Sequence, residues 1–140
     1  MSASRQDAGA SAGRSERPAS LVSSSYTLRL DEAEGGWLTS SWLGRIGDRH
    51  PSVSIQPYLE SLMDHAFEGG LGLHFRLEEL QHFNSSTIAV LVRLIHRIPE
   101  RQGKLRITFD PDKSWQQMCC DVLARFEASV PGLEVREIRS

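Results

Sequence analysis

Residues 71–98 read LGLHFRLEELQHFNSSTIAVLVRLIHRI, and this stretch decides the fold. In residues 71–78, apolar and polar residues alternate, which is typical of a strand that is buried on one face. Residues 88–98 repeat apolar side chains at three- and four-residue spacing, which is typical of an amphipathic helix. Phe83-Asn84-Ser85-Ser86-Thr87 joins the two patterns and offers good residues for beginning a helix. The stretch therefore predicts a strand, a polar turn and a deeply buried helix.

The flanking sequence extends this pattern in both directions. Strands are predicted over 26–30, 37–46, 104–110 and 133–138, with a loop over 47–54. One helix is predicted from about Pro57 until Gly69-Gly70, and another after Asp110. The order is β-β-α-β-α-β-α-β. Strands that are joined through helices are expected to run parallel, whereas the first two can form an antiparallel hairpin.

The strands also predict how the layers are arranged. Two of them are apolar on one side only, whereas a sheet covered by helices on both faces has continuously apolar strands. We therefore expect an α/β, two-layer sandwich with a mixed five-stranded sheet and three helices mainly on one face. The stripe expected to face the core in the last helix contains Trp115, Met118, Cys119, Val122, Leu123 and Phe126.

Composition limits the domain count and the possible functions. The chain has 140 residues, of which 39% are hydrophobic, and a formal net charge of −2, which fits one globular domain. Residues 1–24 contain no aromatic residue, so we expect a disordered tail followed by a domain over 25–140. The near-neutral charge argues against binding to nucleic acid, and there is no apolar run that could cross a membrane. The adjacent Cys119 and Cys120 suit a reducing cytoplasm better than a disulfide.

The turn before the buried helix is the candidate functional site. The beginning of a helix has free backbone N–H groups and a partial positive charge, which together favour an anion. A hydroxyl group there can carry a phosphate of about −1.5 to −2 charges. The simpler alternative is that Asn84 or Ser85 only caps the helix.

The element order and this turn resemble a STAS domain, the fold of bacterial anti-sigma-factor antagonists. In that family the helix opens with Asp-Ser-Ser/Thr-Gly, and the Ser after the Asp is phosphorylated. Asn84 stands in place of the Asp, and Thr87 in place of the Gly. This departure is similar to the SiaC-type branch of regulatory phosphoproteins, where the turn reads Asn-Thr-Ser-Ser-Ile. Both resemblances put the modified residue at Ser85, with Ser86 and Thr87 as less favoured choices.

The resemblance implies a non-catalytic, partner-switching protein without a cofactor or metal. The unphosphorylated form would bind a kinase of the anti-sigma or SiaB type, or a downstream regulatory protein such as a diguanylate cyclase. Phosphorylation would release the partner, and a PP2C-type phosphatase would restore binding. The expected contact surface is Phe83, Asn84, Ser85, Ser86 and Thr87.

An enzyme is the first alternative function. Ser85 or Ser86 could be the nucleophile of a hydrolase, with His82 as the base, because His82 is the nearest histidine in sequence. The Gly-x-Ser-x-Gly motif that shapes such a nucleophile is absent. A solvated or packing role for His82 is therefore favoured.

Binding of a nucleotide or another anion is the second alternative. His74, Arg76, Lys104 and Arg106 are predicted on the outer face of two strands, together with Glu78. If these strands pair, the cations would form a basic patch, although no Walker or Gly-x-Gly-x-x-Gly motif accompanies them.

Asp110-Pro111-Asp112 is a third feature with two readings. It could supply metal ligands, but two acids around a proline at a strand end are more typical of a turn and a helix cap. The nearby Trp115 is expected to pack in the core, and it could also border a docking surface at this end of the sheet.

Overall fold

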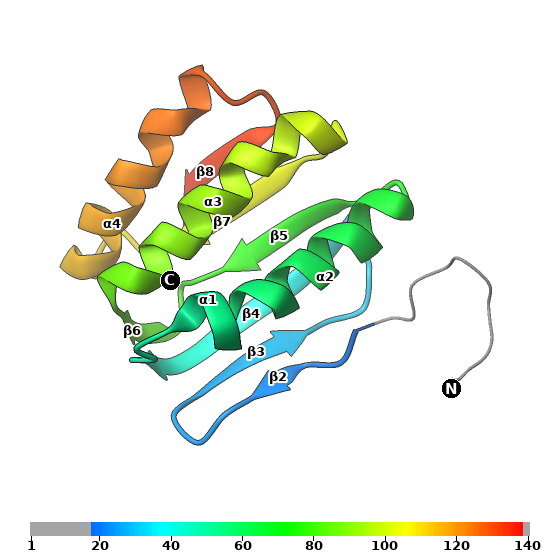
Figure 1. The fold of residues 1–140 in the computed structure, drawn as a ribbon. Helices are drawn as coiled ribbons and strands as arrows, with labels where there is room; N and C mark the ends of the chain where they lie inside the picture. The colour runs from blue at the N-terminus through cyan, green and yellow to red at the C-terminus, as the bar shows by residue number, and fades with distance from the viewer. Residues whose placement is uncertain (1–17, 139–140) are drawn as a thin grey trace.

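The computed structural model describes residues 18–138, which form a sheet covered by helices on one face (Figure 1). The strands are β2 (Leu21–Val22), β3 (Tyr26–Leu30), β4 (Trp37–Ile46), β5 (Gly72–Arg76), β6 (Leu80–Phe83), β7 (Leu105–Phe109) and β8 (Leu133–Glu137). The helices are α1 (Pro51–Ser54), α2 (Gln56–Glu68), α3 (Ser85–Arg101), α4 (Ser114–Ala124) and the short 3-10 helix η1 (Arg125–Ala128).

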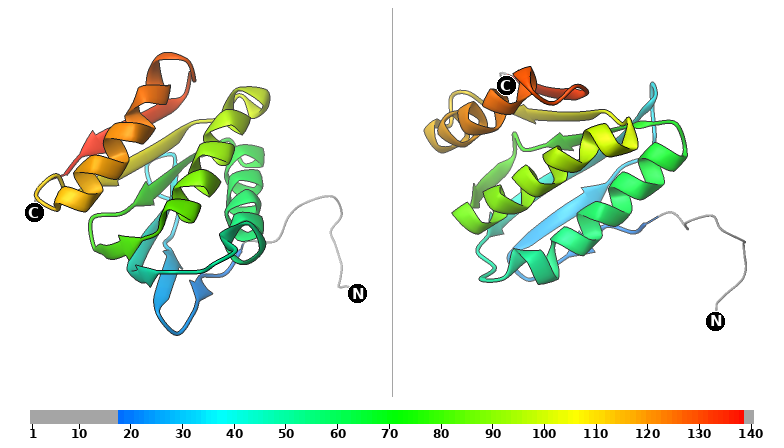
Figure 2. Two further views of the ribbon diagram at one scale, coloured as in Figure 1. Left: turned by 60° about the vertical axis from the view of Figure 1, so that its left-hand side comes forward. Right: turned by 45° about the horizontal axis from the view of Figure 1, so that its top comes forward.

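The sheet is mixed, as predicted. Its strands lie in the order β2-β3-β4-β5-β7-β8, and β6 also pairs with β4. β3 is antiparallel to β2 and β4, whereas β4, β5, β7 and β8 run parallel to one another. α2, α3 and α4 lie on the same face of this sheet (Figure 2). The two-layer architecture is therefore confirmed.

The sheet has two strands more than the five predicted from the sequence. β6 is only four residues long and pairs with the last part of β4, beyond the part that pairs with β5. Only its first and last residues are buried, so the sequence shows no alternation. β2 falls inside the segment 1–24 expected to be a tail, so the sheet begins earlier than predicted. Residues 1–17 of that segment lie outside the described part of the chain.

The core lies between the sheet and its helices, and the central strand–turn–helix unit builds much of it. Leu73, Phe75 and Leu77 are fully or almost fully buried, as the alternation predicts. The buried residues of α3 are Thr87, Val90, Leu91, Leu94, Ile95 and Ile98. α3 continues to Arg101, so Pro99 lies within its last turn instead of ending it. No helix among residues 18–138 is long and apolar enough to cross a membrane.

The predicted loop over 47–54 and the predicted buried face of the last helix are both wrong. The loop expected over 47–54 contains α1, a single helical turn that begins at Pro51, because proline suits the first position of a helix. α4 is also rotated relative to its predicted apolar stripe. Gln116, Cys120 and Leu123 are its buried residues, whereas Met118 is 69% exposed and Val122 is 39% exposed.

Candidate functional site

The predicted site lies where β6 ends and α3 begins. We call this end of the sheet the strand-end rim and define it by Asn84, Ser85, Ser86, Trp115 and Gln116. Asn84 is the residue that precedes α3, and its backbone is extended. Its side-chain oxygen accepts hydrogen bonds from the Thr87 backbone N–H at 3.1 Å and from the Thr87 hydroxyl at 2.8 Å. Its amide nitrogen donates to the backbone oxygen of Asp48 at 2.9 Å. Asn84 therefore caps α3 and fastens it to the segment after β4.

The three candidate hydroxyl groups differ in accessibility. Ser85 and Ser86 are the first two residues of α3, and both are exposed. Neither hydroxyl makes a hydrogen bond within residues 18–138, so both are available to an incoming group. Thr87 is fully buried and its hydroxyl is bonded to Asn84. An enzyme could reach Ser85 or Ser86 directly, whereas Thr87 would first have to be uncovered.

Aromatic side chains support the strand that leads to these serines. Phe83 is buried, and its ring meets the half-buried Trp115 ring edge-on, with centroids 5.3 Å apart. The exposed His82 also lies against Trp115, at 5.7 Å. Trp115 therefore packs against the predicted site and also borders it, which joins α4 to the beginning of α3.

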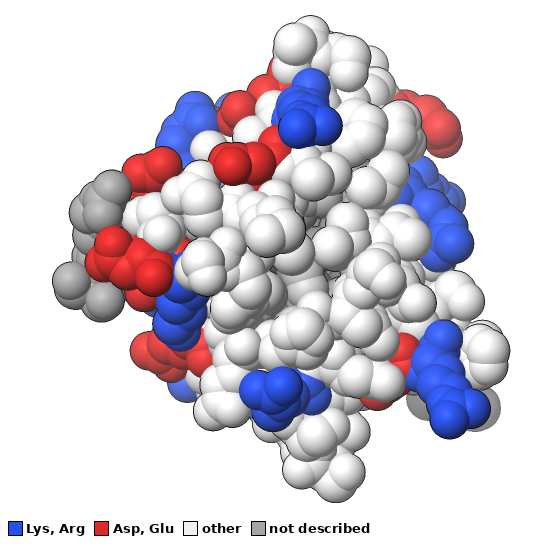
Figure 3. Space-filling view, turned by 90° about the vertical axis from the view of Figure 1, so that its left-hand side faces the viewer, with Lys and Arg blue, Asp and Glu red and all other residues white. Residues whose placement is uncertain are grey.

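The surface around the rim has little charge. In the view of the side where β6, the beginning of α3 and α4 lie, the charged side chains surround a large area without Lys, Arg, Asp or Glu (Figure 3). Val53 of α1 and Met118 of α4 are 76% and 69% exposed, although both are apolar.

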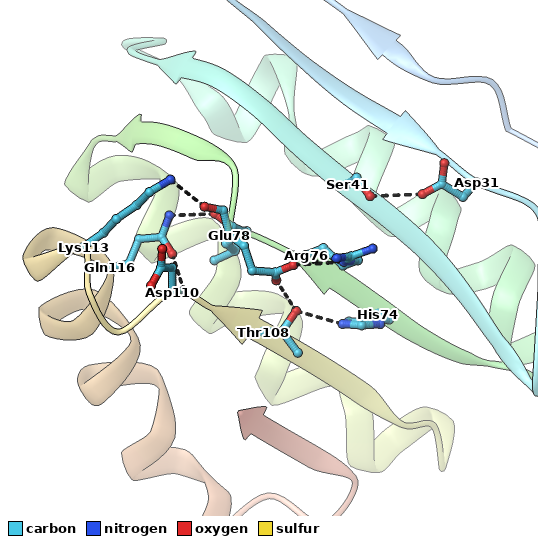
Figure 4. Close-up of polar contacts among 10 residues, drawn as sticks. Asp31, Ser41, His74, Arg76, Glu78, Thr108, Asp110, Lys113 and Gln116 are labelled. Carbon is cyan, nitrogen blue, oxygen red and sulfur yellow. Dashed lines mark hydrogen bonds and ion pairs between the residues drawn. The ribbon is translucent and has the colours of Figure 1, made fainter. Parts of the chain in front are cut away.

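Sequence reasoning missed the residue that anchors this rim. Gln116 is fully buried, and its amide nitrogen donates to the backbone oxygens of Leu77 at 2.7 Å and Leu80 at 3.0 Å. Its side-chain oxygen accepts from the Asp110 N–H at 2.7 Å. Lys113 adds a bond from its ammonium group to the Glu78 backbone oxygen at 2.6 Å (Figure 4). These bonds fix the turn before β6. The signal in the sequence was a glutamine between apolar helix positions, but two of its three partners lie more than thirty residues away along the chain.

The geometry gives the hydrolase alternative no support. The His82 ring lies against Trp115, and no hydrogen bond joins it to Ser85 or Ser86 in the described chain. A serine nucleophile requires a base within hydrogen-bond reach, which is about 2.6–3.2 Å.

The cations predicted on the outer face of the sheet are there, but their charges are neutralised. Arg76 pairs with Glu78 at 3.0 Å, and Arg106 pairs with Glu134 at 3.0 Å. Arg106 also lies 3.9 Å from the centroid of the Trp37 ring. Neighbouring acids therefore balance the two arginine charges of the expected basic patch, and Lys104 is exposed directly before β7.

His74 on the same face is uncharged at neutral pH. Burial lowers the pKa of His74 to about 4, and the nearby Arg106 charge adds to this effect. The Thr108 hydroxyl donates its hydrogen to Glu78, so the His74 ring must donate to Thr108, at 2.9 Å (Figure 4). The histidine thus supports a hydrogen-bond chain and adds no positive charge.

Asp110-Pro111-Asp112 forms a turn, as predicted. The Asp110 carboxylate accepts from the Asp112 N–H at 2.9 Å, and its backbone oxygen accepts from the Lys113 N–H at 3.1 Å. The expected helix cap is wrong, because Lys113 precedes α4 and no side chain caps that helix. Residues 18–138 contain no group of three or more metal-ligating side chains.

Comparison with solved structures identifies the architecture. The chain is similar to an uncharacterized protein of the DUF3478 family from Shewanella loihica PV-4, which has a SpoIIAA-like fold. The TM-score is 0.52 and the sequence identity is 13%, over 83% of this chain and 87% of the other. This chain has a SpoIIAA-like fold. The predicted STAS architecture is therefore confirmed at the level of the fold. No protein-family model and no curated protein matches the sequence.

Proposed function

We propose that this SpoIIAA-like chain is a non-catalytic regulatory protein of the anti-sigma-factor-antagonist type, switched by phosphorylation of Ser85. The observation that carries the proposal is the exposed Ser85 hydroxyl at the first position of α3, beside a surface that is largely free of charge. The resemblance of the turn to phosphorylated turns of the STAS family supports the same residue.

The beginning of α3 can accommodate a phosphate. The backbone N–H groups of Ser85 and Ser86 precede the first N–H that Asn84 caps, and they point out of the helix. A phosphate on Ser85 would gain from these donors and from the positive end of the helix. The modified state would therefore be stabilised by the fold.

The same phosphate would change how a partner docks. It adds about −1.5 to −2 charges to a surface that otherwise carries little charge (Figure 3). A partner that covers this surface would have to remove water from the new charge, which is costly unless a cation pairs with it. The resemblance to the STAS family implies which partners these are: the unmodified protein would bind a kinase of the anti-sigma or SiaB type or a diguanylate cyclase, and a PP2C-type phosphatase would reverse the switch.

Phosphate mapping tests the proposal directly. The full chain is incubated with ATP and an extract of its own source cells, and the modified residues are identified by mass spectrometry. We expect phosphate on Ser85. If Ser85, Ser86 and Thr87 remain unmodified in extracts from every growth condition, the proposed switch is wrong.

Charge variants test the consequence for binding. Ser85→Ala should retain its partner in co-purification from these cells, and Ser85→Asp should lose it. Ser129→Asp adds the same charge at an exposed serine after η1, so it should behave like the unmodified protein. Equal retention by Ser85→Asp and Ser85→Ala would contradict the mechanism.

A further inference from the structure

A cleft of about 380 Å³ lies at the end of the sheet that is opposite to Ser85. It is located where β4, β5 and β7 begin, next to the last turns of α2 and α3. We call this edge the strand-start rim (Gly35, Gly36, Gly72, Gly103 and Gly132). The volume falls within the range of small-molecule sites, about 300–1,000 Å³. The cleft is separate from the site proposed for phosphorylation.

Glycines form much of the cleft wall and hold two aromatic rings close to the backbone. A Cβ atom on Gly72 would lie 2.6 Å from ring carbons of Trp37, and one on Gly103 would overlap the Phe67 ring. Both rings line the cleft. Gly35 and Gly36 have positive φ angles, and a Cβ on either would meet nothing within 4 Å. The wall therefore combines two apolar rings with backbone that no side chain covers at the glycines.

The charged side chains in the wall are all cations. Lys104 and Arg101 line the cleft, and no carboxylate does. Arg101 forms an ion pair with Asp64 at 2.5 Å, which balances its charge but leaves other N–H groups of the guanidinium available to a ligand. Lys104 is exposed and makes no ion pair within residues 18–138.

The ends of two helices oppose these cations only weakly. α2 and α3 both end near the cleft, and a helix C-terminus carries about half a negative charge. Their last carbonyl groups already accept hydrogen bonds from Gly69, Gly70, Gln102 and Gly103. Because these carbonyl groups are already hydrogen-bonded, the two helix ends together cancel only part of the Lys104 charge, and the remainder favours an anion.

We propose that this cleft binds a small planar aromatic carboxylate. The ring would contact Trp37 and Phe67, and the carboxylate would lie beside Lys104 with Arg101 as a further donor. Aromatic pairs are stabilising beyond the area that they bury, and a guanidinium fork matches the geometry of a carboxylate. This site is independent of the proposed switch at Ser85.

A matched pair of probes tests both parts of the proposal. Indole-3-acetate and indole-3-acetamide have the same ring and differ in charge. In ¹⁵N-labelled full-length chain, either probe should shift the amide resonances of the cleft glycines, with Gly44 and Gly47 as controls elsewhere in the fold. The carboxylate should bind about three- to fivefold more tightly than the amide, as expected for one exposed ion pair.

A single variant then assigns the charge preference to Lys104. Lys104→Gln should weaken the binding of indole-3-acetate by about three- to fivefold and leave the affinity for indole-3-acetamide unchanged. Arg125→Gln removes an exposed cation from η1 and should change neither affinity. The proposal is overturned if the amide resonances of the cleft glycines do not shift at millimolar probe concentration. It is also overturned if both probes bind equally tightly, or if Lys104→Gln does not change the affinity for indole-3-acetate.

Discussion

The two rims of the sheet are built by opposite means. At the strand-end rim, amide side chains reach between elements, as the buried Gln116 does to the turn before β6 and the half-buried Asn84 to the segment after β4. At the strand-start rim, the absence of side chains lets backbone and rings approach one another, as at Gly103 and Gly132. At the strand-end rim, side-chain hydrogen bonds fix the position of the exposed serines. At the strand-start rim, the glycines leave room for a cleft. The following predictions test that difference.

The largest effect is expected for Gln116→Leu. The substitution removes three hydrogen bonds and takes from the Leu80 backbone oxygen and the Asp110 N–H the partner that Gln116 supplies, whereas the Leu77 backbone oxygen still accepts from the Leu80 N–H. Unsatisfied buried groups cost about 1–3 kcal/mol each, so we expect a loss of about 3–4 kcal/mol in the free energy of unfolding in urea. Gln117→Leu is the matched control, because within residues 18–138 the Gln117 side chain bonds only to Asp121 on the same exposed side of α4. Similar losses for the two variants would show that Gln116 does not anchor the rim.

Gly132→Ala tests the opposite rim. Gly132 has a φ angle of +94°, and a Cβ atom there would overlap the Gly103 backbone oxygen. Backbone strain plus this overlap should cost about 2–3 kcal/mol in the free energy of unfolding. Gly35→Ala has a positive φ of +61° but open space, so it should cost only about 1 kcal/mol. If both variants were equally stable, close backbone approach would not explain this rim.

Asn84 variants separate the two hydrogen-bonding roles of one side chain. Asn84→Ala removes the helix cap and should cost about 1 kcal/mol in urea unfolding. Asn84→Asp keeps an acceptor for Thr87 and loses the bond to the Asp48 backbone oxygen, so its cost should be smaller. An Asp variant less stable than the Ala variant would show that repulsion between the new carboxylate and the Asp48 backbone oxygen outweighs the cap.

The smallest effect is expected for Met118→Gln. Met118 is 69% exposed, so the free energy of unfolding should change by less than about 0.5 kcal/mol. Leu123→Gln makes a similar change at a fully buried position of the same helix and should cost about 2 kcal/mol or more. A large loss from Met118→Gln would mean that this side chain supports the fold and does not serve a free surface.

The strongest sequence patterns predicted the strand-end rim well. The alternation before the turn and the apolar stripe after it identified β5 and α3, and Asn84 was already a candidate cap. β6 was missed because four residues are too few to show a period. The face of α4 was mispredicted because Gln116 is buried by hydrogen bonds, which hydrophobicity does not register. The cleft was not predictable, because it combines three turns that come together only in the folded chain.

α3 connects the two rims, and its length has a consequence for how they communicate. Seventeen helical residues span about 25 Å, with Ser85 at one end and Arg101 beside the cleft at the other. Electrostatic screening at physiological salt acts over about 8 Å, so charge at one end is scarcely felt at the other. Occupancy of the cleft and phosphorylation of Ser85 should therefore be independent inputs, and all four combined states should be accessible. Any dependence of cleft occupancy on phosphorylation would require α3 to shift as a rigid unit.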